Sequence, residues 1–160
     1  MSTFLDASIV DVAAVRARLG REPAGRFAVV VRRIDGAPVV IENEPHLRDG
    51  TPMPTLYWLV DPPISDAVSA IEGAGGVHRY EELVDPAELE RTHAAYAKRR
   101  EAATVRLGAI AATGGVGGTR VGVKCLHAHV ANLLAGFDDP VGELVVREID
   151  VPVLVHEVVR

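Results

Sequence analysis

The chain is short of cysteine and aromatic residues and has no long apolar run, and each shortage excludes a class of protein. Only one of its 160 residues is cysteine, so no intramolecular disulfide can form, and we expect a reducing, cytoplasmic environment. Aromatic residues make up 4% of the chain, with one tryptophan. No stretch approaches the roughly 18 apolar residues of a membrane span, and no signal peptide is evident. The sequence therefore predicts a soluble protein without a membrane span.

Clustered positive charge is also missing. The chain has 17 Lys and Arg against 22 Asp and Glu, a formal net charge of -5, and no basic block. Because nucleic-acid binding needs a basic surface, we expect no nucleic-acid partner. Hydrophobic residues at 48% and charged residues at 24% are typical of a globular protein. We expect a single domain over residues 1–160, with residues 1–25 as an N-terminal helix and residues 145–160 as a C-terminal strand.

Turn signals and apolar periodicity predict an α+β fold. The turn dipeptide Asp35-Gly36 joins two β-branched runs into a hairpin, residues 26–33 and 38–42. Further strands are predicted at 55–60 and around 153–159. Helical spacing and capping residues predict four helices: residues 6–19, 65–73, 86 to about 111, and 121–135. We expect a mainly antiparallel sheet of three to four strands, packed by about four helices that cover one face or one end.

The most reactive stretch runs from Lys124 to His129 and holds the single cysteine. On a helix, Cys125 and His129 share a face with Asn132. The pair suits two ligands of a metal site, with more distant ligands such as His46 or His93, or a thiolate with its base. Alternatively, Cys125 is a small buried core residue.

His127 is a second candidate in the same stretch, and it points about 160° around the helix from His129. The two histidines therefore cannot both bind one ion, and at most one of them belongs to a site with Cys125. The other is expected to form a structural hydrogen bond or to lie in solvent.

The glycine-rich residues 114–118 precede Arg120 and Lys124, which the pattern places just before and within the first turn of the 121–135 helix. Anions bind at helix N-termini because the N–H groups there are free and the helix dipole is positive. The two cations are therefore candidate anion-binding residues. The pattern is neither a P-loop nor a dinucleotide fingerprint, and it favours a flexible hinge over an anion site.

A polar loop with three prolines precedes the third strand. Its side chains Asp49, Thr51 and Thr55 lie next to Tyr57 and Trp58 in the sequence and are candidate ligand contacts. The alternative is a proline-locked turn in which the Asp and Thr side chains bond backbone donors.

Two motifs resemble a bacterial domain-of-unknown-function family, number 501, which is frequent in actinobacteria. They are Asp49-Gly50-Thr51-Pro52-Met53-Pro54-Thr55-Leu56-Tyr57-Trp58-Leu59 and Val123-Lys124-Cys125-Leu126-His127-Ala128-His129. The second motif continues to Asp139-Pro140-Val141-Gly142, similar to a turn of the family, and the resemblance covers residues 26–144. It implies no activity. Genes of the family often lie near those for a septum-formation initiator and an exopolyphosphatase, which implies an association with cell division.

Departures from the family pattern concern possible metal ligands. Many members resemble Arg-Cys-x-Cys-Gly-x-Pro and Leu-Thr-Cys-Pro where this chain has Arg33, Asp35 and Asp61 in place of the cysteines. Together with Cys125, those members carry four cysteines, the number for a zinc or iron–sulfur site. The resemblance implies that positions 33, 35, 61 and 125 lie together, and that here an ion pair of Arg33 with Asp35 or Asp61 replaces the metal. We therefore expect no metal and no cofactor.

The sequence favours a binding or regulatory module whose surface is formed by the Asp49–Thr55 loop and the start of the 121–135 helix, with a small anion or a protein as partner. The first alternative is an enzyme acting on a small, possibly phosphorylated substrate. In it, His127 or His129 serves as acid or base and Arg120 and Lys124 hold the anion, with Cys125 as a further catalytic candidate. The second alternative is a cell-division-associated interaction protein.

Overall fold

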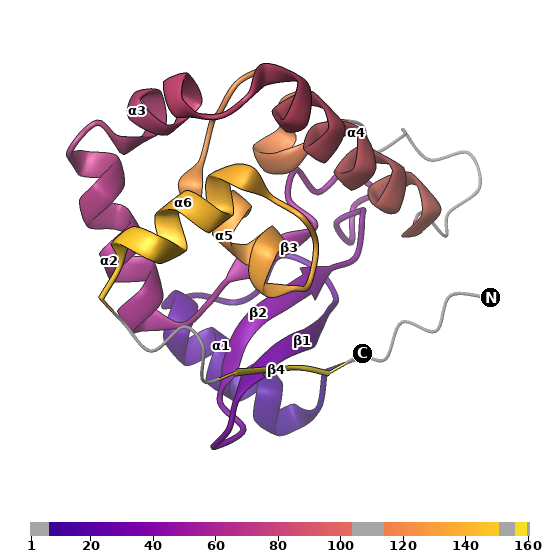
Figure 1. Cartoon of the computed structure of the whole chain (residues 1–160). Coiled ribbons are helices and arrows are strands. Elements are labelled where there is room, and N and C mark those ends of the chain that lie inside the picture. The colour runs from indigo at the N-terminus through magenta and orange to yellow at the C-terminus, as the bar shows by residue number, and fades with distance from the viewer. Residues whose placement is uncertain (1–6, 104–113, 151–155, 160) are drawn as a thin grey trace.

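The computed structural model describes residues 7–103, 114–150 and 156–159 and confirms the α+β class (Figure 1). Its sheet has four antiparallel strands in the order β3-β2-β1-β4. Their bounds are β1 Phe27–Arg33, β2 Pro38–Asn43, β3 Tyr57–Leu59 and β4 His156–Val158.

The predicted hairpin of β1 and β2 is confirmed. Gly36 has a φ of 90°, a left-handed conformation that glycine adopts without strain. The side chain of Asp35 accepts a hydrogen bond from the N–H of Ala37 at 3.0 Å, and Arg33 N–H donates to the carbonyl of Ala37 at 2.9 Å. The turn chemistry is local, which is why the sequence pattern predicted it.

The described residues form six α-helices and one short 3-10 helix, two α-helices more than predicted. Their bounds are α1 Ile9–Leu19, α2 Pro62–Gly73, α3 Gly76–Leu83, α4 Pro86–Ala103, η1 Val116–Gly118, α5 Leu126–Leu134 and α6 Pro140–Glu148. The sequence interpretation missed α3 and α6. None of the helices in the described part of the chain combines the length and apolar character needed to cross a lipid bilayer.

Several predicted boundaries were wrong. The helix predicted over 121–135 begins at Leu126. The helix predicted from 86 to about 111 is described from Pro86 to Ala103, and residues 104–113 lie outside the described residues. The C-terminal strand assigned to 145–160 is wrong at its start, because α6 continues to Glu148. Of the strand predicted around 153–159, His156–Val158 is observed, and 151–155 lie outside the described residues.

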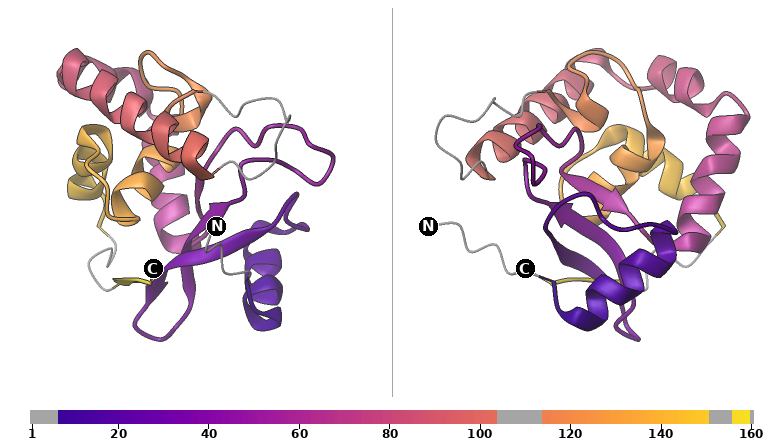
Figure 2. Two further views of the ribbon diagram at one scale, coloured as in Figure 1. Left: turned by 90° about the vertical axis from the view of Figure 1, so that its right-hand side faces the viewer. Right: turned by 180° about the vertical axis from the view of Figure 1, so that it is seen from behind.

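Helices cover both faces of the sheet, whereas the sequence predicted one face or one end. On one face, Val15 of α1 packs against Phe27, Val29 and Ile41. On the other face, the larger core joins the sheet to helices α2–α6 and includes the fully buried Leu126 of α5. Figure 2 shows α1 alone on its side of the sheet. Helix α5 packs against β3 and α6, so the residues at its N-terminus are held by the core.

Candidate functional site

The N-terminus of α5 carries the reactive stretch but begins later than predicted. Cys125 is the N-cap residue, with extended backbone angles of φ −148° and ψ 116°, and its side chain makes no capping hydrogen bond. Lys124 therefore precedes the helix instead of lying in its first turn. Cys125 also does not share a helical face with His129, which corrects the pairing predicted from their spacing.

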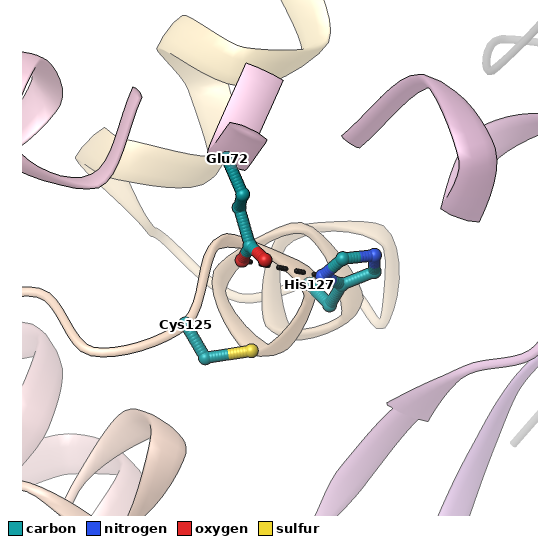
Figure 3. Close-up of side chains that lie close together, drawn as sticks. All are labelled: Glu72, Cys125 and His127. Atoms are coloured by element: carbon teal, nitrogen blue, oxygen red, sulfur yellow. Dashed lines mark ion pairs between the residues drawn. The ribbon is translucent and has the colours of Figure 1, made fainter. Parts of the chain in front are cut away.

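Glu72, in the last turn of α2, supplies the cap that α5 lacks. Its Oε1 accepts a hydrogen bond from the N–H of Leu126 at 2.7 Å and lies 3.2 Å from Nδ1 of His127. Together with Cys125, these side chains form a cluster in which one oxygen, one sulfur and one ring nitrogen all lie within 4.8 Å of one another (Figure 3). All three residues are partly exposed. We call Glu72, Cys125 and His127 the thiol centre.

His127 is held in its protonated form by its neighbours. Its Nδ1 faces the Glu72 carboxylate, and its Nε2 lies 3.1 Å from both the carbonyl oxygen of Ser65 and the hydroxyl of Ser69. Because a carboxylate and a carbonyl only accept hydrogen bonds, both ring nitrogens act as donors. The hydrogen bond with Cys125 raises the pKa of His127 most; burial opposes this, and the charge of Glu72 adds to it, giving a value of about 9.

His129 points into the core and belongs to a different network. It is fully buried, and its Nδ1 lies 2.9 Å from both carboxylate oxygens of Asp139. Asp139 also accepts hydrogen bonds from the side chain of Asn132 at 3.0 Å and the N–H of Gly142 at 2.9 Å. The Nε2 of His129 is buried without a hydrogen-bond partner. Two of the residues predicted to share a helix face, His129 and Asn132, therefore both bond to Asp139. His127 and His129 point in different directions, as predicted.

His93 is a structural histidine that supports the glycine-rich connector. Its Nδ1 accepts from the N–H of Val116 at 3.1 Å, and its Nε2 donates to the carbonyl of Gly122 at 2.8 Å. Burial lowers the pKa of His93, and the bond to Gly122 only partly offsets this. A Cβ on Gly115 would lie 2.5 Å from the His93 side chain, so this glycine is required for close packing. Among the described residues, neither His93 nor His46 is grouped with the thiol centre.

The loop that carries Asp49, Thr51 and Thr55 bonds largely to itself. Asp49 Oδ1 accepts from the N–H of Thr51 at 2.9 Å, and the carbonyl of Thr51 accepts from Leu47 N–H at 2.8 Å. The carbonyl of Thr55 accepts from Asn43 at 3.1 Å. These bonds fit the proline-locked turn better than an open ligand site. Tyr57 is buried in the core, stacked on Phe137 with ring centroids 5.6 Å apart, and Trp58 is partly buried.

Arg100 connects this loop to the connector that precedes α5. It is almost fully buried and donates hydrogen bonds to the carbonyls of Met53 and Gly114. Arg100 therefore ties the first motif to the connector that leads to the second motif. Arg120 and Lys124 are exposed. The N-terminal N–H of α5 to which we expected an anion to bind is bonded to the carboxylate of Glu72 instead. An anion-binding role for Arg120 and Lys124 stays a prediction.

Positions 33 and 61 lie together, and an ion pair joins them. Arg33 Nε is 2.8 Å from Asp61 Oδ1, and Nη2 is 2.5 Å from Oδ2. Asp61 is also the N-cap of α2, and Arg18 approaches it at 3.4 Å. Burial favours a raised pKa for Asp61, but the bonds from Arg33 outweigh it, so its pKa is lowered.

Cys125 is not part of this ion-pair cluster. It lies beside Glu72, which follows Asp61 along α2 by about 16 Å at a rise of about 1.5 Å per residue. The expectation that all four positions lie together is therefore wrong for Cys125. That the ion pair of Arg33 and Asp61 stands in place of a metal stays a proposal.

Sequence reasoning missed Glu72 and Asp139. Asp139 precedes Pro140 at the start of α6, an N-cap signal that could have revealed it. Glu72 has no such signal, because its partner Leu126 is 54 residues away in the chain.

Comparisons with known proteins agree with the resemblance of the two motifs. A family model described as "Protein of unknown function (DUF501)" matches residues 29–147. No curated protein and no solved structure matches the chain. Since the match covers well over half of the sequence and contains the whole thiol centre, the chain belongs to the DUF501 family.

Proposed function

We propose that the chain is a small binding and regulatory module that captures its ligand at the thiol centre. The observation that carries this proposal is the meeting of a sulfur, an imidazole and a carboxylate at a partly exposed position. Two further histidines, His93 and His129, are buried and bonded within the fold. The ligand expected from this chemistry is one that forms a bond to sulfur.

Two features of the site support a reactive sulfur. Sγ of Cys125 lies within 4.8 Å of a ring nitrogen of His127, so a group that can donate or accept a proton stands next to the sulfur. Cys125 is also the N-cap of α5, where the helix dipole favours negative charge. Both effects act on the same atom, which makes this thiol a reasonable point of attack for an electrophile.

Alkylation of Cys125 in the folded, metal-free protein tests the proposal. We expect iodoacetamide to modify the native protein readily, and replacement of His127 by Gln to slow the reaction about tenfold near neutral pH. His78→Gln is the matched control, because His78 is exposed on α3. A thiol that reacts only after denaturation would overturn the proposal.

A second candidate is an enzyme in which Cys125 is the nucleophile and His127 the general acid. It is favoured by the protonated imidazole next to the thiol. Arg120 and Lys124 would hold an anionic substrate. An activated ester such as p-nitrophenyl acetate separates the two functions. A module gives one equivalent of product and stops, whereas an enzyme continues to turn over.

A further inference from the structure

We infer that the thiol centre is a binding site for a soft divalent metal ion, zinc above all, with Glu72, Cys125 and His127 as its ligands. The inference rests on the proposed function for the location of the site and names the ligand that the site takes.

The ligand atoms already have nearly the required spacing. In a tetrahedral zinc site, bonds of about 2.0–2.3 Å place neighbouring ligand atoms about 3.3–3.8 Å apart. Oε1 of Glu72 lies 3.2 Å from Nδ1 of His127, and the sulfur of Cys125 lies within 4.8 Å of both groups. Figure 3 shows the three side chains pointing toward a common point. A side-chain adjustment of about 1 Å suffices to close the site on an ion.

The hydrogen bond on the far side of His127 is the one a metal-binding histidine needs. Such a histidine coordinates through one nitrogen and donates the N–H of the other to a carboxylate, a backbone carbonyl or a water, which fixes the orientation of the ring. Nε2 of His127 lies 3.1 Å from the carbonyl oxygen of Ser65 and 3.1 Å from the hydroxyl of Ser69. This leaves Nδ1, the nitrogen that faces Glu72, to bind the ion.

Charge also favours a cation at this point. Nδ1 of His127 faces the Glu72 carboxylate at 3.2 Å. A divalent ion bound here would have its charge balanced by the carboxylate and by the thiolate that forms on coordination. One proton leaves His127 and another leaves the thiol as the two bonds form.

The ligands belong to elements that the fold holds in place. Glu72 is on the last turn of α2, and Cys125 and His127 flank the fully buried Leu126 at the start of α5. The core therefore fixes the backbone of both segments.

The ligand set also indicates which metal binds. A thiolate and an imidazole select zinc or a similar transition metal over magnesium and calcium, which prefer oxygen ligands. Three protein ligands are the number in catalytic zinc sites, in which water or substrate takes the fourth position. Because all three side chains are partly exposed, a fourth ligand can reach the ion.

Metal titration of the full-length, reduced protein tests the inference. We expect one zinc ion per chain by calorimetry, and cobalt to give a thiolate-to-metal charge-transfer band. Glu72→Gln, Cys125→Ser and His127→Gln each weaken zinc binding by more than about a hundredfold, and Ser69→Ala by up to about tenfold. His78→Gln leaves the affinity unchanged. Wild-type protein alkylated at Cys125 loses zinc binding, which covers the case in which the serine variant does not fold.

The thiol assay separates failure of this inference from failure of the proposed function. If the folded, metal-free protein is alkylated rapidly and added zinc does not slow the reaction, the metal site is overturned and the reactive thiol is retained. A thiol that is inert in the folded, metal-free protein overturns the proposed function. Zinc that binds equally well to the Cys125→Ser variant overturns the ligand assignment.

Discussion

Oε1 of Glu72 lies 3.2 Å from Nδ1 of His127. The same oxygen accepts the N–H of Leu126 at 2.7 Å, so one carboxylate both pairs with the imidazolium and caps α5. The two roles depend on different properties of the side chain. The pairing needs negative charge, whereas the cap needs only an oxygen acceptor.

Replacing Glu72 by Gln separates these roles. We expect the pKa of His127 to fall by about one unit, from about 9 toward its ordinary 6.5, because the negative charge is lost. The free energy of unfolding at neutral pH falls by about 1.4 kcal/mol, the equivalent of one pKa unit, and by no more than this because the amide oxygen still caps Leu126. NMR titration of the His127 ring and urea denaturation measure the two quantities. Glu82→Gln, on the exposed surface of α3, is the control. An unchanged His127 pKa would contradict the pairing.

His127 makes the stability of the metal-free protein depend on pH. Its pKa is about 9 in the folded protein and 6.5 ordinarily, so folding favours the protonated ring. The stabilisation is fully present below pH 6.5 and is lost as the pH rises through about 9. Its upper limit is about 3 kcal/mol, and partial exposure of the ring reduces this to about 2 kcal/mol.

Urea denaturation across this pH range measures the loss. Wild type and His78→Gln should become less stable between pH 6.5 and 9, whereas His127→Gln should lose this part of the dependence. The same slope in all three proteins would assign the effect to another group.

The buried pair of His129 and Asp139 is expected to contribute strongly to stability. Asp139→Asn leaves one side-chain oxygen to serve the His129 ring, the side chain of Asn132 and the N–H of Gly142. We expect a loss of about 2 kcal/mol in the free energy of unfolding, because buried hydrogen-bond donors are left without an acceptor. Asp138→Asn is the control, since Asp138 is exposed and adjacent in the chain. Equal effects of the two substitutions would argue against the network.

Two glycines test the packing of the connector. A methyl group on Gly115 would lie 2.5 Å from the His93 side chain, whereas a Cβ on Gly73 meets nothing within 4 Å. We expect Gly115→Ala to cost about 2 kcal/mol. Gly73→Ala is neutral or stabilises by up to about 1 kcal/mol, because it restricts the unfolded chain. Thermal unfolding compares the two. A tolerated alanine at position 115 would show that the connector has room to move.

Local chemistry explains why some helix N-termini could be predicted from the sequence. Asp85 before Pro86 predicted the start of α4, and Asp85 Oδ1 accepts the N–H of Ala87 at 2.7 Å. The same pattern at Asp61 and Asp139 marks the starts of α2 and α6. The helix predicted over 65–73 starts three residues too late, although Asp61 before Pro62 carries the same start signal. Helix α6 was missed because its first turn was interpreted as a family turn.

Only part of the candidate site could be predicted from the sequence, because one of its residues is brought in by long-range packing. Sequence reasoning identified Cys125 and both histidines of the motif, but it paired the cysteine with His129 on an assumed continuous helix. The backbone is extended at Cys125, and the helix begins one residue later. The actual third partner, Glu72, comes from α2, and only the docking of α2 against α5 brings it near. Long-range docking of this kind leaves no mark in local spacing.

The cap that Glu72 provides for α5 has a consequence for how the chain folds. A nine-residue helix without its own cap is too short to be stable alone, so α5 gains its first turn only when α2 is already beside it. The first turn of α5 therefore forms together with the docking of α2 against α5, and this local element depends on a contact 54 residues away in the chain.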